Sequence, residues 1–188
     1  MNVFVVGPEH SGSKWAARLC IAAGAGAERS ATYLGAQPIA GRDGRPLCLH
    51  RSMPQGGDWP NIVELVHCHH IERIAIMTRH WFPMVRSQAH PESQRGVHHP
   101  NDPAAALEEA ERYARQAYIR IFGAMGDLGA KVPWIVCTYR ELLEEPAART
   151  AFLEFMGLGV PDSIPQPFNA NAKWYHDPEA RPEQGNPG

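Results

Sequence analysis

The sequence has few cysteines, no excess of positive charge and no long apolar run, and each absence excludes a class of protein. The four cysteines show no paired spacing and lie in apolar segments, which is typical of reduced core cysteines rather than of a disulfide framework. Because 18 Lys and Arg residues are scattered among 20 Asp and Glu residues, no basic face is available to bind a nucleic-acid polymer. No apolar run approaches the roughly 20 residues that cross a bilayer. We therefore expect a soluble, cytoplasmic protein that binds neither a nucleic-acid polymer nor a membrane.

The apolar segments that are present are short strands alternating with helices. Strands are predicted at 2–6, 46–54, 73–78 and 132–139, and helices at 13–23, 59–70, 103–126 and 147–159. Wholly apolar strands that alternate with helices are typical of parallel sheets. We expect an α/β, three-layer P-loop-type domain over residues 1–159, with a central parallel sheet of about four to five strands covered by helices on both faces. An irregular, partly disordered Pro-rich tail is expected at 160–188.

The turn after the first strand is the first candidate site. Gly7 and Gly12 bracket the residues Pro8–Ser11, and Ser13 is predicted to cap the following helix. Such a loop can turn its N–H groups toward an anion, and the positive end of the helix dipole stabilises bound negative charge. A tight turn without a ligand is the alternative reading of the same pattern.

The loop departs from the nucleotide triphosphatase pattern GxxxxGK[ST], because Ser13 and Lys14 stand in the opposite order. Those enzymes also hold magnesium with an Asp at the end of a later strand. Here the corresponding strands run into Arg79 and toward Arg140. The sequence therefore disfavours a triphosphatase or a magnesium-dependent kinase and implies no metal.

Three segments resemble the sulfotransferase family. GPEHSGSKWAARL resembles its 5′-phosphosulfate loop, RHWFPMVRSQ resembles its 3′-phosphate motif, and YRELLEEPAARTAFLEFMGL resembles its closing segment. These segments follow the family's order and extend over most of residues 2–159. The resemblance implies a P-loop α/β fold, the donor 3′-phosphoadenosine 5′-phosphosulfate and the product adenosine 3′,5′-bisphosphate. The acceptor would be a hydroxyl or amine on a small molecule or glycan.

The resemblance assigns the first loop to the 5′-phosphate. The N–H groups of Ser11, Gly12 and Ser13, with the two serine hydroxyls, would hold it. The family usually places Lys or Arg where this chain has His10. A protonated His10 or Lys14 would supply the charge on the leaving phosphate, and the sequence leaves both open.

Two further segments would bind the other end of the nucleotide. Arg79 and Ser87 have the spacing of the family's 3′-phosphate pair, and Arg79 would make a two-pronged charge-assisted contact. A surface ion pair is the alternative role for Arg79. Lys173, beside Trp174 in the tail, is a further candidate nucleotide contact.

The general base is not at the family's usual position, where this chain has Ser52. His50 lies two residues earlier, hence on the same face of the strand, and is the preferred candidate. Glu9 is the second candidate. If neither serves, the chain would be a non-catalytic adenine-nucleotide-binding module, and a P-loop nucleotide or small-molecule kinase is a further alternative.

Remaining motifs have simpler readings. His67 and His70 are predicted to share a helical face, but no second ligand pair accompanies them, so a polar cluster at a helix end is favoured over zinc. His98 and His99 lie in a polar loop that could meet the acceptor, although a plain solvated loop is favoured. A third set, Tyr118, Ile119 and Phe122, has core spacing and is predicted to pack inside the domain.

Overall fold

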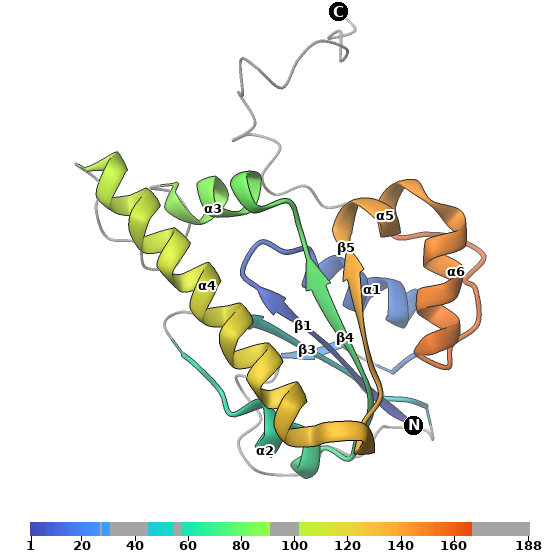
Figure 1. The fold of residues 1–188 in the computed structure, drawn as a ribbon. Helices are drawn as coiled ribbons and strands as arrows, with labels where there is room; N and C mark the ends of the chain where they lie inside the picture. The colour runs from blue at the N-terminus through green and yellow to red at the C-terminus, as the bar shows by residue number, and fades with distance from the viewer. Residues whose placement is uncertain (27, 31–44, 55–57, 91–101, 167–188) are drawn as a thin grey trace, which may run out of the picture.

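The computed structural model describes residues 1–26, 28–30, 45–54, 58–90 and 102–166, and its centre is one parallel sheet (Figure 1). The strands are β1 (Asn2–Pro8), β2 (Glu28–Ser30), β3 (Cys48–Met53), β4 (Ile71–Thr78) and β5 (Trp134–Thr138). Their order is β2-β3-β1-β4-β5, and every neighbouring pair is parallel. The predicted α/β class and parallel sheet are confirmed.

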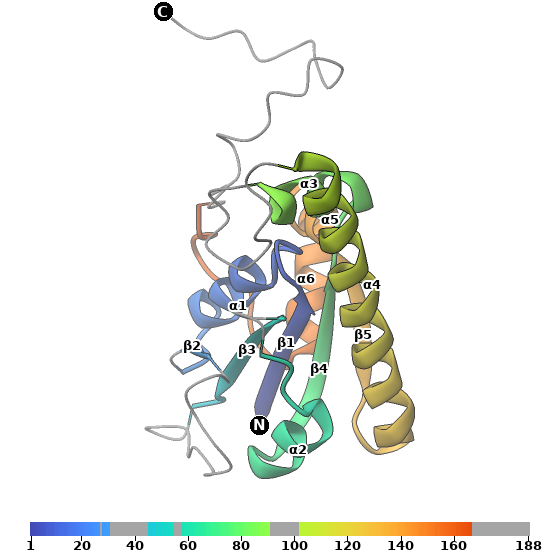
Figure 2. The same cartoon turned by 90° about the vertical axis from the view of Figure 1, so that its left-hand side faces the viewer.

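Helices cover both faces of the sheet. They are α1 (Ser13–Ala22), α2 (Ile62–Cys68), α3 (Trp81–Ala89), α4 (Pro103–Leu128), α5 (Tyr139–Glu144) and α6 (Pro146–Phe155). On one face α1, α5 and α6 enclose a core that includes Val5 and Ala75, whereas α2 and α4 enclose Phe4 and Ile76 on the other. Successive strand residues point to opposite faces, so each inner strand supplies side chains to both cores. Figure 2 shows α1 and α4 on opposite sides of the sheet.

The longest helix begins where the sequence predicts. Asp102 caps α4 by accepting hydrogen bonds from the N–H groups of Ala104 and Ala105, and Pro103 occupies the first turn. The first half of α4 packs against α3 through the buried residues Met84, Val85, Ala110 and Ala114. This contact fixes α3 across the carboxyl end of the sheet, where β4 ends.

Several boundaries differ from the prediction. β1 continues through Gly7 and Pro8, which lie opposite Ser52 and Met53 of β3. β2 lies in a segment that is predicted to be a connection between elements. α5 was not predicted, although Thr138 and Glu141 form a capping box, and the T-x-x-E pattern that signals it is present in the sequence.

The prediction that Ile119 and Phe122 pack inside the domain is wrong. Ile119 is 71% exposed and Phe122 is 41% exposed. The buried stripe of α4 passes instead through Ala117, Ile121 and Ala124. The three predicted residues lie one or two positions off this stripe, and only Tyr118 is partly buried, against the α3–α4 contact.

The cysteines are free, as expected, and Cys20 and Cys48 are buried in the core. Burial, with a smaller contribution from the Glu141 carboxylate, raises the pKa of the Cys137 thiol to about 11. Among the described helices, none combines the length and the apolar composition that spanning a bilayer requires. The predictions for His98, His99, Lys173 and most of the tail lie outside the described residues.

Candidate functional site

The site candidates lie at the carboxyl end of the sheet, where the connections of two neighbouring strands diverge. β1 continues into α1 on one face, whereas β4 leads through α3 into α4 on the opposite face. β1 and β4 are adjacent in the sheet. Open parallel sheets bind ligands at this kind of topological switch point. The topology therefore places the loop after β1 and the residues after β4 in one region.

Ser11 is turned into the protein rather than toward this region. Its N–H donates to the carbonyl oxygen of Pro8 over 3.1 Å, and the residue is fully buried. Its hydroxyl has no hydrogen-bond partner among the described residues and lies against Gly7, where an added Cβ would come within 2.4 Å of the Ser11 Oγ. The N–H group that is predicted to hold an anion is thus paired within the loop, and the hydroxyl is buried. Gly7 is required because the loop folds back onto its Cα.

Gly12, not Ser13, is the N-cap of α1. Gly12 has a φ of 90° in the left-handed region, and no side chain caps the helix. An added Cβ at Gly12 would lie 2.3 Å from the ring of Tyr139. The predicted cap by Ser13 is therefore wrong, because Ser13 is already the first helical residue. Gly12 accommodates the Tyr139 ring, a contact between positions far apart in the sequence.

The hydroxyl of Ser13 joins α1 to β3. Its Oγ lies 3.1 Å from Nε2 of His50 and 3.3 Å from Oγ of Ser52. Both contacts come from one face of β3, as the two-residue spacing predicts. Ser13 and His50 are buried, whereas Ser52 is partly exposed. The candidate base thus contacts a buried hydroxyl, which in turn contacts the hydroxyl of the partly exposed Ser52.

Arg51 lies between His50 and Ser52 on β3, and its side chain therefore points to the opposite face of the strand. Its side chain is fully buried, and its guanidinium donates to Oδ2 of Asp58 over 2.7 Å. A buried guanidinium is costly unless it is paired, so this contact is a structural requirement of the β3 end. Arg51 is not among the predicted site residues.

The loop after β1 is held by α3. Nδ1 of His10 lies 3.0 Å from the Ser87 hydroxyl, and the carbonyl oxygen of Glu9 accepts a 2.7 Å hydrogen bond from the Gln88 side chain. Arg79 donates to the carbonyl oxygen of His10 over 3.3 Å. These contacts bring together the segments assigned to the 5′-phosphate and to the 3′-phosphate. The contact of Gln88 with the loop was not predicted, because the only sequence feature that marks Gln88 is its position next to Ser87, which is not distinctive.

Cationic groups gather at this end of the sheet. Arg79 is partly exposed, and its guanidinium lies 5.2 Å from the centroid of the Tyr139 ring. Lys14 is exposed in the first turn of α1, where the N–H groups of an α-helix have no intrahelical acceptor. By contrast, Glu9 is 6% exposed. The accessible charged side chains that the prediction singled out at this site are therefore positive.

The comparisons with known proteins do not assign this chain to a family. No family model matches the chain, and no curated protein matches it. The functional assignment therefore depends on the motifs and on the geometry described above.

The histidine cluster lies far from this site, at the turn between α2 and β4. α2 ends at Cys68, and His70 has a φ of 49°, so His67 and His70 do not share a helical face as predicted. No group of three or more metal-ligating side chains occurs among the described residues. His69 is fully buried, and neither of its ring nitrogens has a hydrogen-bond partner within the described ranges.

Burial, with a smaller effect of His70, lowers the pKa of His69 below its ordinary value of 6.5. Below about pH 6.5 the unfolded chain therefore binds a proton that the folded chain excludes, and the free energy of unfolding falls. We expect His69→Leu to remove this part of the acid sensitivity and to leave stability at pH 7.5 unchanged or raised by about 1 kcal/mol. Urea denaturation between pH 7.5 and pH 5 measures this.

The exposed His67 provides the matched control, because His67→Gln also removes one imidazole from α2 and its flanking turn. His67→Gln should keep the acid sensitivity of the native protein. An unchanged pH dependence in His69→Leu would contradict the assignment of that sensitivity to the buried ring.

Proposed function

We propose that this protein is a sulfotransferase-like enzyme with a P-loop-type anion site. It would transfer a sulfuryl group from 3′-phosphoadenosine 5′-phosphosulfate to a hydroxyl or amine of a small-molecule or glycan acceptor. The observation that carries the proposal is the 3.0 Å contact between His10 and Ser87, beside which Arg79 donates to the carbonyl oxygen of His10. It joins the two motifs that would bind the two ends of the donor, although they are 77 residues apart.

The residues at this edge of the sheet fit an anionic nucleotide. The first N–H groups of α1, on Ser13 and Lys14, are available at the positive end of the helix dipole. Lys14 is exposed beside them, while Arg79 lies between β4 and α3 and Ser87 lies on α3. In this assignment the α1 terminus and Lys14 bind the 5′-phosphate, while Arg79 and Ser87 bind the 3′-phosphate. Ser11 supports the loop without touching the ligand.

The chemistry requires charge stabilisation and one proton acceptor. The bond from sulfur to the bridging oxygen of the 5′-phosphate breaks as a bond forms from sulfur to the acceptor oxygen or nitrogen. Lys14 or a protonated His10 would stabilise the charge left on the phosphate. The acceptor proton would pass to Oγ of Ser13 as the Ser13 proton passes to Nε2 of His50, because these two atoms lie 3.1 Å apart. Glu9 stays the second candidate for the base, since it is buried to about the same degree as His50.

Isothermal titration tests the binding part of this proposal. The purified protein is titrated with adenosine 3′,5′-bisphosphate without magnesium and, separately, with ATP and magnesium. We expect the bisphosphate to bind at least about tenfold more tightly, because only it engages both phosphate subsites. A preference for magnesium-ATP would withdraw the roles of Arg79 and Ser87 and favour the kinase alternative.

The same titration of His50→Gln separates the enzyme from a non-catalytic module. The variant should bind the bisphosphate as the native protein does, and it should lose sulfuryl transfer to any acceptor found by screening with labelled donor. Transfer that is unaffected by the substitution would remove the proposed role of His50.

A further inference from the structure

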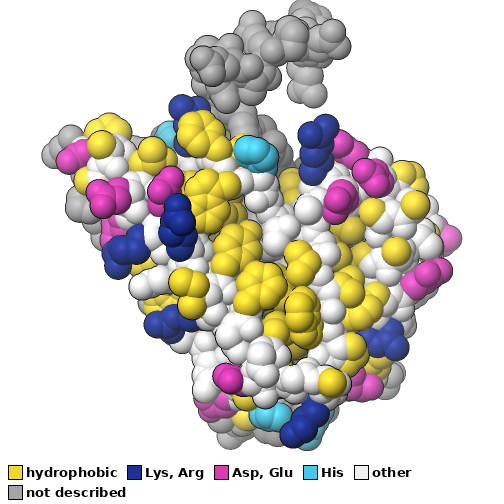
Figure 3. All heavy atoms as spheres, in the orientation of Figure 1, with side chains coloured by type: hydrophobic (Ala, Val, Ile, Leu, Met, Phe, Trp, Pro, Cys, Tyr) yellow, Lys and Arg dark blue, Asp and Glu magenta, His cyan; other side chains and the backbone are white. Residues whose placement is uncertain are grey.

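The helix α3 has two chemically different sides within the protein. Met84 and Val85 are buried and pack against α4. Figure 3 shows hydrophobic side chains gathered where α3 meets α4 and on toward β5, so this contact is apolar at the surface as well. The two remaining buried residues of α3, Ser87 and Gln88, are polar. Because a buried polar group costs free energy unless it is hydrogen-bonded, these two side chains need partners.

The partner of Gln88 is the loop that joins β1 to α1. We call residues Glu9–Gly12 the β1–α1 loop. The side-chain amide of Gln88 donates to the carbonyl oxygen of Glu9 over 2.7 Å. The N–H of Glu9 in turn donates to the carbonyl oxygen of Met53 on β3 over 3.1 Å. Both backbone groups of Glu9 are therefore hydrogen-bonded, one to the sheet and the other to α3.

The next residue of the loop, His10, has a backbone conformation that needs this support. Its φ is 63°, in the left-handed region that residues other than glycine seldom adopt. Such a conformation persists where the surrounding structure fixes it. Gln88 holds the peptide group before His10, and Arg79 holds the carbonyl group after it. The peptide groups on both sides of His10 are thus hydrogen-bonded to side chains from outside the loop.

We propose that Gln88 is a positioning residue for the 5′-phosphate of the donor, an inference that rests on the function proposed above. Two residues separate His10 from the start of α1. The path of the chain at His10 therefore directs the His10 ring and the first N–H groups of α1, which are assigned to the 5′-phosphate. Displacing such groups by about 1 Å is enough to weaken the contacts they make. Ser87 is assigned to the 3′-phosphate itself, so adjacent residues of α3 act on opposite ends of the donor.

Gln88→Met tests this proposal, because methionine has a similar length and no hydrogen-bond donor. We expect the variant to bind adenosine 3′,5′-bisphosphate and AMP about tenfold more weakly than the native protein does, by the same factor for both nucleotides. Both nucleotides carry the 5′-phosphate, whereas Ser87→Ala should weaken the bisphosphate alone. Isothermal titration measures these affinities. Gln116→Met, at a partly exposed position of α4, is the matched control and should leave both within about twofold.

A purely structural role of Gln88 predicts a different result. Gln88→Met would then lower the free energy of unfolding in urea, because the Glu9 carbonyl loses its partner, while the folded variant kept the native affinities. That outcome would overturn the proposal, and so would a changed ratio between the two nucleotides, which would place the effect at the 3′-phosphate. The proposed function itself fails in another way, through a native protein that prefers magnesium-ATP to the bisphosphate.

Amide hydrogen exchange follows the β1–α1 loop without any nucleotide. The N–H of Ser11 donates to the carbonyl oxygen of Pro8 within this turn. It should exchange at least about fivefold faster in Gln88→Met than in the native protein. The N–H of Met156, which donates to the carbonyl oxygen of Phe152 at the end of α6, is the internal reference and should be unchanged. Unchanged exchange at Ser11 would show that Gln88 does not hold the loop, and it would overturn the proposal.

Discussion

Arg79→Ala is expected to weaken binding of adenosine 3′,5′-bisphosphate about 100-fold and binding of AMP by less than about threefold. A guanidinium that pairs with a phosphate makes a charge-assisted, two-pronged contact whose loss costs about 2–3 kcal/mol. AMP lacks the 3′-phosphate and cannot make this contact. The small effect on AMP reflects the hydrogen bond from Arg79 to the carbonyl oxygen of His10, which also supports the loop. Isothermal titration of both nucleotides into both proteins measures the difference.

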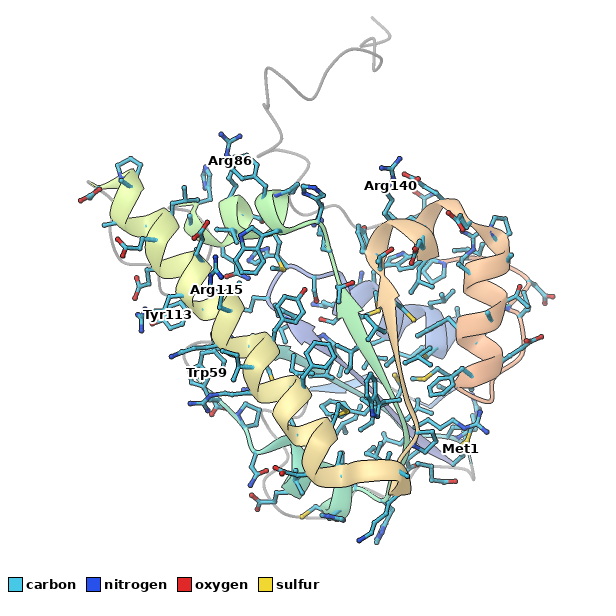
Figure 4. All side chains as sticks on the ribbon, viewed as in Figure 1. Met1, Trp59, Arg86, Tyr113, Arg115 and Arg140 are labelled. Carbon is cyan, nitrogen blue, oxygen red and sulfur yellow. The ribbon has the colours of Figure 1, made fainter. Side chains whose placement is uncertain are left out.

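Arg86 provides the matched control for this substitution. It lies on α3 near Arg79, its guanidinium stacks 4.3 Å from the centroid of the Phe82 ring, and it points away from the body of the protein in Figure 4. Arg86→Ala removes the same charge and should leave both affinities within about twofold. If Arg79→Ala weakened the two nucleotides equally, the residue would support the loop without reading the 3′-phosphate.

Gly12→Ala is expected to lower the free energy of unfolding by about 3 kcal/mol. The left-handed φ of 90° accounts for about 1 kcal/mol of this. The remainder comes from overpacking, because the new Cβ would lie 2.3 Å from the ring of Tyr139. Urea denaturation with an unchanged m-value measures the loss. An effect of this size would show that the protein needs Gly12 for its stability, independently of any contact between Gly12 and a ligand.

A double-mutant cycle with Tyr139→Ala separates strain from overpacking. Without the ring, the Gly12→Ala substitution should cost only about 1 kcal/mol, since the backbone strain remains and most of the overlap is gone. Tyr139 also packs edge-on against Trp15, with 5.9 Å between centroids, so the single Tyr139 variant is itself destabilised and serves as the reference for the cycle. An equal cost in both backgrounds would show that the ring does not constrain Gly12.

Gly12 and the pair His50 and Ser52 show what sequence patterns can and cannot predict at this site. The motif that contains Gly12 is local, and its place between a buried strand and a helix was predicted correctly. The physical reason for a glycine at this position could not be predicted, because the Tyr139 ring comes from a segment more than a hundred residues away. Similarly, the spacing of His50 and Ser52 predicts a shared face. Only the packing of α1 on β3 shows that both side chains meet the Ser13 hydroxyl.

The helix α4 shows the limit of periodicity. The predicted apolar residues Ile119 and Phe122 have helical spacing, yet they are exposed, because alanines such as Ala117 make the close contact with the sheet. A pattern of large side chains cannot reveal which strand lies under a helix. That depends on where β4 and β5 sit in the sheet order.

The sequence by itself determined the α/β class, the parallel sheet and the residues that follow each strand, because strand length, glycine turns and helix caps are local properties. It also determined the motifs on which the proposed sulfotransferase activity depends. Tertiary structure alone decided that His10 meets Ser87 and that Trp134 and Val136 of β5 are exposed. Both depend on the order of strands in space and on helices that pack across them, and neither is encoded within a single segment.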